Sequence, residues 1–199
     1  MVRVGVSVEG ATEERFVKMV LGPYLLNRGI HITPIPVNGD LSVDKVRGEL
    51  RKIGYNFDFV TTLYDFYGFK NKNPNEDKES LEQRIINCAH PSIRNKLIPY
   101  IQMYEFEGLL FSCPTSMERG MNEKGVKSWC ESTLSKFSYN PEAINNSVNT
   151  SPSKRLERST SYRKTTHGPN IAKEIGIEKI REMCVGFDKW LLALESLEV

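Results

Sequence analysis

The sequence predicts an α/β fold in which helices flank a mainly parallel β-sheet. Short apolar segments with the period of a strand alternate with segments of helical period along the first half of the chain. Three of these predicted strands end in an acidic residue. The chain has 199 residues, 39% hydrophobic and 26% charged, which suits one globular unit with a substantial core. Alternating strands and helices favour a parallel sheet, because each crossover needs a connecting helix.

The predicted strands are rich in β-branched and aromatic residues. Val2–Val8 has valine at every second position, so we expect a strand with one β-branched face. Residues 30–37 (IHITPIPV) predict a second strand, whose prolines suggest an edge position. Residues 57–69 (FDFVTTLYDFYGF) predict a third strand that ends at Asp65. Residues 97–111 predict a fourth strand that turns helical towards its end.

Helical segments are predicted between these strands. Thr12 is expected to cap the first helix, which ends near residues 27–29. Two more helices are predicted over residues 42–53 and around residues 78–88, the latter after an exposed polar loop.

The second half of the sequence has a looser, helical pattern. It begins after Pro114, and residues 168–199 have helical spacing of their apolar side chains. We predict a single domain over residues 1–199, with an α/β core over about 1–113 and a helical and loop extension over about 114–199.

Composition excludes several classes of protein. The formal net charge of +2 is too small to indicate a polyanion partner, so a nucleic-acid function must rest on local charge. The N-terminus does not resemble a signal peptide and no segment is long and apolar enough to span a membrane, so we expect a cytoplasmic protein without membrane contact. The cysteines and histidines are scattered, which favours reduced thiols and does not favour a zinc site.

Acidic residues follow the predicted strands. Glu9, Asp65 and Glu105 end three strands, Glu107 lies just beyond, and Glu13 falls in the first turn of the first helix. The carboxyl ends of parallel strands meet at one edge of a sheet, where ligands bind in open α/β folds. Clustered carboxylates repel each other unless a cation neutralises them, and oxygen-only ligands favour Mg²⁺ or Mn²⁺. The sequence therefore predicts a metal site at this edge.

Each acid also has a structural alternative that the sequence leaves open. Glu13 can simply complement the helix dipole, and Asp65 can cap the turn that follows it. Glu105 and Glu107 can be solvated acids at a helix start. Glu9 is the hardest to explain in this way, because it ends a strand that we expect to be central.

Two stretches, SVEGATEERF and TTLYDFYGF, resemble the Toprim domain, the metal-dependent catalytic module of topoisomerases, primases and OLD-type nucleases. Over nearly its full length the chain is similar to the DUF4276 family of small Toprim-like proteins. The similarity lies in these stretches and in IPYIQMYEFEGLLF, PEAIN…SPSKRL, SYRKTTHGPNIAKEIGIEKIR and CVGFDKWLLALE. The resemblance implies a Toprim-like, Rossmann-like core. It implies Glu9 as metal ligand or general acid–base, and Asp65 as the first acid of the second motif.

The family resemblance also implies a bacterial setting, in which such proteins are often encoded beside an ABC-type ATPase in anti-phage defence systems. One departure is clear: Toprim domains carry Asp-x-Asp in the second motif, whereas Tyr67 stands at the second acidic position here. Glu13, Glu105 and Glu107 are the candidate replacements.

A basic segment lies between residues 154 and 167. Basic side chains interleaved with hydroxyls suit a phosphate backbone, although a solvated surface loop is the alternative. Lys154 and Lys164 are candidate catalytic residues, because a lysine near a metal can stabilise the charge that develops during phosphodiester cleavage. The predicted nucleic-acid-binding residues are Lys154, Arg155, Arg158, Tyr162, Arg163 and Lys164.

These observations predict a Mg²⁺- or Mn²⁺-dependent nuclease that acts on DNA or RNA, with an ABC-type ATPase as partner and a homo-oligomer as a further expectation. The chain contains no GxxxxGK[ST] motif and no recognisable hydrolase triad. One alternative is a catalytically degenerate Toprim-like subunit that binds an ATPase. Another is a phosphatase-like or receiver-like domain, which the absence of DxDxT disfavours.

Overall fold

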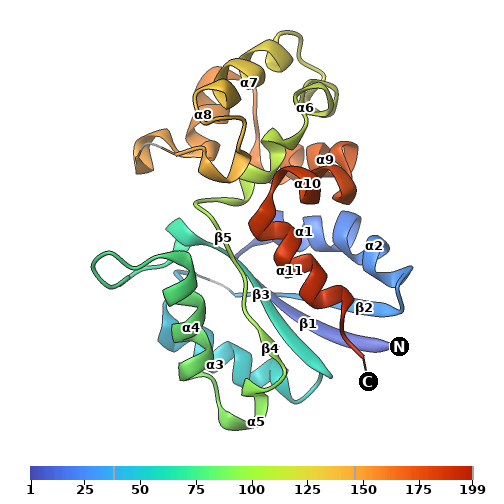
Figure 1. Ribbon diagram of the computed structural model, residues 1–199, viewed down its shortest axis with the longest axis vertical. Helices are drawn as coiled ribbons and strands as arrows, with labels where there is room; N and C mark the ends of the chain where they lie inside the picture. The colour runs from blue at the N-terminus through green and yellow to red at the C-terminus, as the bar shows by residue number, and fades with distance from the viewer. Residues whose placement is uncertain (38, 146, 199) are drawn as a thin grey trace.

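A parallel β-sheet crosses the lower half of the molecule (Figure 1). The computed structural model describes residues 1–37, 39–145 and 147–198, and within them the sheet has five strands in the order β2-β1-β3-β4, with β5 also paired to β3. All of these pairings are parallel, which confirms the predicted fold class. The strands are β1 (Val2–Val8), β2 (Ile30–Pro36), β3 (Phe59–Asp65), β4 (Leu97–Ile98) and β5 (Ile101–Gln102).

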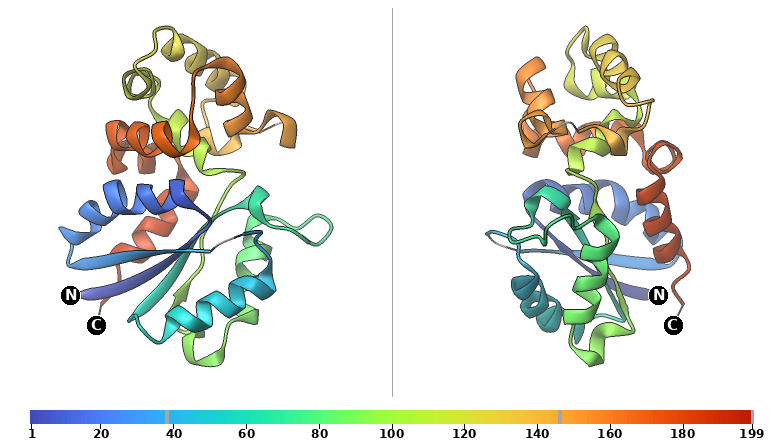
Figure 2. Two further views of the ribbon diagram at one scale, coloured as in Figure 1. Left: turned by 180° about the vertical axis from the view of Figure 1, so that it is seen from behind. Right: turned by 60° about the vertical axis from the view of Figure 1, so that its left-hand side comes forward.

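Helices cover both faces of the sheet, as the view from behind and the rotated view also show (Figures 1 and 2). One face carries α1 (Ala11–Phe16), the π-helical turn η1 (Val17–Leu21), α2 (Gly22–Leu26) and α11 (Val185–Glu195). The other face carries α3 (Val43–Gly54), α4 (Lys78–Cys88) and α5 (Pro91–Arg94). Two hydrophobic clusters, one on each side of the sheet, form the core.

The central strands are buried on both faces rather than on one. In β1, Gly5 and Ser7 are buried together with the alternating valines, as expected for a central strand. The Ser7 hydroxyl accepts a hydrogen bond from the Tyr64 hydroxyl at 2.6 Å, which satisfies these buried polar groups. A two-sided cover is typical of parallel sheets. Strand β2 lies at the edge, as its prolines predicted.

The fourth predicted strand is interrupted. Strands β4 and β5 are separated by Pro99 and Tyr100, because proline has no N–H to donate to the ladder. The Thr62 side chain bridges the gap: its hydroxyl accepts from the Tyr100 N–H at 2.8 Å and donates to the Tyr100 carbonyl at 2.9 Å. The segment then continues as a 3₁₀-helix, η3 (Phe106–Ser112).

A helical layer lies above the carboxyl-terminal edge of the sheet (Figure 1). Helix α9 packs against both α1 and α6, so this layer is joined to the core where the strands end. No helix among the described residues is long and apolar enough to cross a membrane. The elements of this layer and the remaining short turns are η2 (Phe66–Gly68), α6 (Pro114–Met121), α7 (Val126–Ser135), η4 (Pro141–Ala143), η5 (Val148–Thr150), α8 (Pro152–Ser159), α9 (Lys164–Ile175) and α10 (Ile177–Met183).

The first helix begins earlier than predicted. Gly10, rather than Thr12, is its N-cap residue. The reason is local: the Glu13 carboxylate reaches back and accepts a hydrogen bond from the Gly10 N–H at 3.0 Å. This is half of a capping box, and it fixes the turn between β1 and α1.

Candidate functional site

Five carboxylates converge where the strands end. Glu9 follows β1, Glu13 lies in the first turn of α1, Asp65 ends β3, and Glu105 and Glu107 lie at the start of η3. They are close enough for each acid to perturb the ionisation of others in the group. The structure therefore brings together all five acids that the sequence singled out, from four separate segments of the chain.

Each of the five carboxylates uses one oxygen for a hydrogen bond within the protein. The other oxygen accepts no hydrogen bond from the described residues, and in Glu107 that atom, Oε2, is fully buried. The first oxygen thus fixes the orientation of each side chain and leaves the second for another partner. The bonds run from the Asp65 N–H to Glu9 (3.3 Å), from the Gly10 N–H to Glu13 (3.0 Å), from the Phe106 N–H to Asp65 (2.7 Å), from the Ser153 N–H to Glu105 (2.9 Å) and from the Tyr162 hydroxyl to Glu107 (3.1 Å).

Lys164 is the cation of this cluster. It is the first residue of α9, and its Nζ lies 3.7 Å from Asp65 Oδ2 and 3.5 Å from Glu107 Oε2. Burial lowers the pKa of Lys164, but the carboxylates of Asp65 and Glu107 outweigh it and hold that pKa above its usual range. Lys164 therefore stays charged and neutralises part of the cluster.

Three of these carboxyl groups have a raised pKa and hold their protons more tightly than usual. Burial and then the neighbouring Glu13 raise the pKa of Glu9, although Lys164 opposes them. Burial raises the pKa of Asp65 well above its usual range despite Lys164, with Glu13 and Glu9 adding to the effect. Burial, again against Lys164, raises the pKa of Glu107 to about 7. The single positive charge of Lys164 thus does not balance the negative charge of five ionised acids.

A cleft of about 520 Å³ opens onto this cluster. Its walls come from the start of α1, from residues 39–41, from residues 67–70 and from Lys164 with Thr165. Gly68 makes room for the Glu9 carboxylate, since a Cβ atom there would lie 2.2 Å from Glu9 Oε2. The sequence analysis did not identify this close approach, and a glycine directly after the Asp65 turn was the available signal.

Tyr67, at the position of the second Toprim acid, lines the same cleft. Its hydroxyl is hydrogen-bonded to the Asn145 side chain, and its ring lies 5.4 Å from that of Tyr104. Of the candidate replacements for an acid there, Glu107 shares Lys164 with Asp65, whereas one oxygen of Glu105 caps the start of α8.

The basic segment is divided among three environments. Lys164 joins the acids, but Lys154 pairs with Glu157 at 2.8 Å on α8 and makes no contact with them. Tyr162 is buried, with its hydroxyl on Glu107, so the surface position expected for a nucleic-acid contact is wrong. Its apolar ring fills the space between α9 and η3, which a polar neighbourhood in sequence does not reveal. The half-buried Arg155 lies over the Phe137 ring, and the remaining two arginines are exposed: Arg158 and Arg163.

The donor chemistry of the cluster fits a hard divalent cation. All of its ligating groups are carboxylates, they are undercompensated, and the buried Glu107 Oε2 lacks a hydrogen bond. As the side chains stand, however, no three acidic, cysteine or histidine groups of the described residues form a ready ligand set. The Lys164 ammonium lies between two of the candidates.

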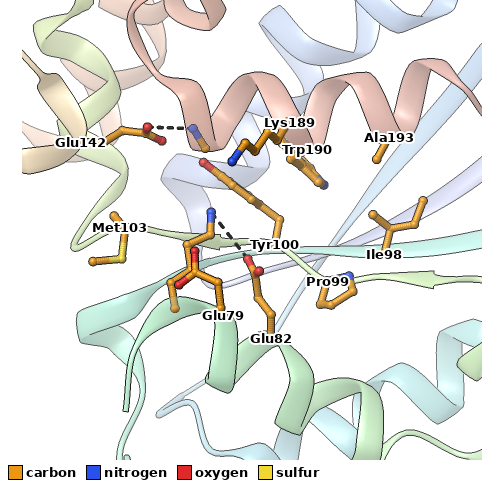
Figure 3. Close-up of a pocket in the computed structure, with 12 residues that line it drawn as sticks. Glu79, Glu82, Ile98, Pro99, Tyr100, Met103, Glu142, Lys189, Trp190 and Ala193 are labelled. Atoms are coloured by element: carbon orange, nitrogen blue, oxygen red, sulfur yellow. Dashed lines mark hydrogen bonds and ion pairs between the residues drawn. The ribbon is translucent and has the colours of Figure 1, made fainter. Parts of the chain in front are cut away.

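A second cavity, of about 490 Å³, lies between α4 and α11 (Figure 3). Lys78 lies over the Tyr100 ring at 4.3 Å and pairs with Glu82 at 3.6 Å. The Glu142 carboxylate accepts from the N–H groups of Gly186 and Phe187 at the start of α11, at 2.8 and 3.1 Å. The acids of this cavity that face inward therefore already have partners.

Residues 8–195 match a family model described as "Domain of unknown function (DUF4276)". The chain belongs to the DUF4276 family. Among solved structures, the DUF4276 chain is similar to the C-terminal region of the Burkholderia pseudomallei OLD protein, with 17% identity, a TM-score of 0.49 and coverage of 98% of this chain and 99% of that one. It is also similar to the C-terminal region of the Xanthomonas campestris pv. campestris OLD protein, with 13% identity, a TM-score of 0.44 and coverage of 96% and 97%. No curated protein sequence shows significant similarity to it.

Proposed function

We propose that this DUF4276 protein is a Mg²⁺- or Mn²⁺-dependent nuclease. The observation that carries the proposal is the group of five carboxylates, each held by one oxygen and left with the other, around a single lysine. A purely structural cluster would be expected to use both oxygens or to carry matching cations. The Toprim resemblance of SVEGATEERF and TTLYDFYGF supports the same chemistry.

In this proposal, Glu9, Glu13, Asp65 and Glu107 hold the metal, with Glu105 at the margin. Bound there, a divalent cation would activate water and stabilise the leaving oxygen of a phosphodiester. Glu9, with its raised pKa, is suited to move a proton to or from the reacting groups.

Lys164 has a second role in the proposal. With the acids neutralised, its ammonium is free to hold a phosphate oxygen of the substrate. Its side chain is 39% exposed and lines the cleft, so it can reach the substrate without a change in the backbone. Lys154 stays a candidate for the same charge stabilisation, and it would require movement away from Glu157.

The nucleic acid would approach over the basic side of α8 and the start of α9. Arg158 and Arg163 are exposed there, and exposed cations bind a phosphate backbone without regard to sequence. The DUF4276 resemblance further supports an ABC-type ATPase as partner and a role in anti-phage defence. We place the reaction in the cytoplasm, where the protein would meet both the nucleic acid and the ATPase.

The second candidate is a subunit that binds an ATPase without catalysis. Two observations favour it: Tyr67 stands where Toprim domains have an acid, and Lys164 already lies between Asp65 and Glu107. In that case the lysine would be a permanent substitute for the metal, and the cluster would be a structural remnant.

The test compares Glu9→Gln and Asp65→Asn with a matched control, Glu14→Gln. Glu14 is adjacent in sequence to Glu13, but its carboxylate forms a surface pair with Lys18. Purified proteins are incubated with duplex DNA, single-stranded DNA and RNA, with and without Mg²⁺ or Mn²⁺. Thermal unfolding is followed under the same conditions. We expect metal to raise the melting temperature and to permit cleavage in the wild type and in Glu14→Gln, because a ligand that binds only the folded state stabilises it.

The two site variants should lose both the metal-dependent cleavage and the metal-dependent rise in melting temperature, yet remain folded. Each substitution removes one negative charge that repels its neighbours. The metal-free melting temperatures of both variants should therefore equal or exceed that of the wild type. A wild type that ignores both metals, together with site variants that unfold, would replace this proposal with the ATPase-binding subunit.

A further inference from the structure

The candidate cleft is lined by a second lysine besides Lys164. Lys70 lines the cleft together with Tyr67 and Gly68. Its side chain is exposed, and among the described residues its ammonium has no ion pair and no hydrogen bond. Asp40 lines the same wall but does not lie within ion-pair distance of it. Lys70 is therefore a cation that the fold itself does not use.

The backbone of Lys70 is nevertheless held firmly. Its N–H donates to the Leu41 carbonyl at 2.9 Å, and the preceding Phe69 forms a parallel bridge with Leu41. Both Leu41 and Phe69 are buried in the core cluster on the α3 face, and the Phe69 ring packs edge-on against Tyr64. A free ammonium thus extends from a fixed point at the rim of the cleft.

Lys72, two residues further on, shows what a structural lysine looks like in the same turn. Its ammonium donates to the carbonyls of Phe66 and Phe69 at 3.0 and 2.9 Å and lies over the Phe66 ring at 5.0 Å. The turn is therefore already closed by Lys72, and it does not need Lys70. The stability of the turn therefore does not explain the presence of Lys70.

We propose that Lys70 binds a backbone phosphate of the nucleic acid next to the one that is cleaved. This inference rests on the proposed nuclease function. Glu9 and Glu13 line the cleft and would repel a polyanion, so a cation at the rim is needed to draw the strand in. Lys164 lies in contact with the acids, whereas Lys70 stands apart from them and is free to hold the strand. Lys70 is thus a positioning residue for substrate, and Lys164 acts at the reacting phosphate.

The experiment compares Lys70→Met and Lys70→Arg with Lys136→Met. Lys136 follows α7, is exposed and forms no side-chain hydrogen bond or ion pair with the described residues, so it controls for the loss of one surface charge. Binding of a fluorescein-labelled oligonucleotide, as duplex DNA, single-stranded DNA and RNA, is measured by anisotropy against salt concentration in EDTA. Cleavage of the same probes is measured in Mg²⁺.

We expect Lys70→Met to raise both Kd and KM about two- to fivefold, the effect of one exposed ion pair, with kcat unchanged. The dependence of log Kd on log salt should become shallower by about 0.9 for duplex and about 0.7 for single strands. Lys70→Arg should restore both quantities, because any cation at this point can hold a phosphate.

Lys70→Met that matches Lys136→Met in affinity, salt slope and KM, in a wild type that cleaves, overturns the role of Lys70 and leaves the nuclease proposal standing. A wild type that neither binds nor cleaves any of the probes overturns the nuclease proposal, and the role of Lys70 with it. A fall in kcat without a change in KM in Lys70→Met would also overturn the role of Lys70. A positioning contact that is made equally in the ground state and the transition state changes KM alone.

Discussion

Two of the charged cavities among the described residues differ in how their acids are bound. Between α4 and α11, both oxygens of Glu142 accept N–H groups, so neither oxygen is left without a partner (Figure 3). In the acid cluster above the strands, Asp65 and Glu107 each have one hydrogen bond and a shared lysine.

This difference separates a structural use of charge from a functional one. The Glu142 contacts satisfy the start of α11, where orphan N–H groups need acceptors, so removing them should affect stability alone. Burial, and then the neighbouring acids, raise the pKa of Asp65 and Glu107 despite Lys164. Holding these carboxyl groups in this way costs free energy of folding, and a functional role would explain that cost. Perturbation of the two cavities should therefore give opposite patterns of stability and activity.

The largest expected effect comes from Gly68→Ala. A Cβ atom at this position would lie 2.2 Å from Glu9 Oε2, so the Glu9 carboxylate must move. We expect nuclease activity to fall about 100-fold, the cost of a displacement of about 1 Å in a catalytic group. The measurement is the cleavage rate in Mg²⁺, alongside the melting temperature.

Gly48→Ala is the matched control for this substitution. Gly48 lies within α3, and nothing lies within 4 Å of a Cβ added there. Alanine should stabilise the helix by about 0.5–1 kcal/mol and leave activity unchanged. Equal activities in Gly68→Ala and Gly48→Ala would mean that the position of Glu9 does not matter to catalysis.

The sequence predicted the framework well where a local signal decided the structure. The bounds of β1, the end of β3 at Asp65 and the extent of α4 follow from periodicity and end signals. The cap at Gly10 was missed, because it depends on the Glu13 side chain, which reaches back to it. The break in the fourth strand was also missed, although Pro99 was a local signal for it.

The candidate site was predictable in its acids but not in their partners. Strand ends placed Glu9 and Asp65, since parallel strands bring their carboxyl ends together. The burial of Tyr162 against Glu107 has no local signature, because basic and hydroxyl neighbours conceal it in the sequence. The contrast between Lys70 and Lys72 could not be predicted from the sequence of residues 70–72 either. It depends on which backbone carbonyls of the turn lie within reach of each ammonium.

The second prediction concerns pH. The pKa of Glu107 is raised from 4.5 to about 7 by burial, so the metal-free folded protein binds a proton that the unfolded chain has released between these values. Its free energy of unfolding should therefore fall as pH rises through this range, by about 1–3 kcal/mol. Chemical denaturation in EDTA at a series of pH values measures this slope.

Glu107→Gln should flatten that dependence, because glutamine has no proton to lose, while Glu14→Gln on the surface should not. Mg²⁺ should also flatten it in the wild type, because a cation at the site stabilises the ionised carboxylates. Stability that instead rises with pH over this interval would show that Lys164 compensates the acids fully, and the cleft would then resemble the cavity between α4 and α11.

The smallest expected effect lies in that second cavity. Glu142→Ala removes the acceptor for the Gly186 and Phe187 N–H groups, and the loss of such a cap costs about 1 kcal/mol. For a chain of this size the melting temperature should fall by about 2–4 °C. Glu79→Ala is the control, since Glu79 lines the same cavity with an exposed carboxylate that accepts no hydrogen bond from the described residues. Differential scanning calorimetry and the cleavage rate per folded molecule are measured together. We expect both variants to cleave at the wild-type rate, because neither residue contacts the acids above the strands.

A loss of cleavage in Glu142→Ala without a loss of stability would reverse the assignment of the two cavities, and would make the α4–α11 cavity the functional one.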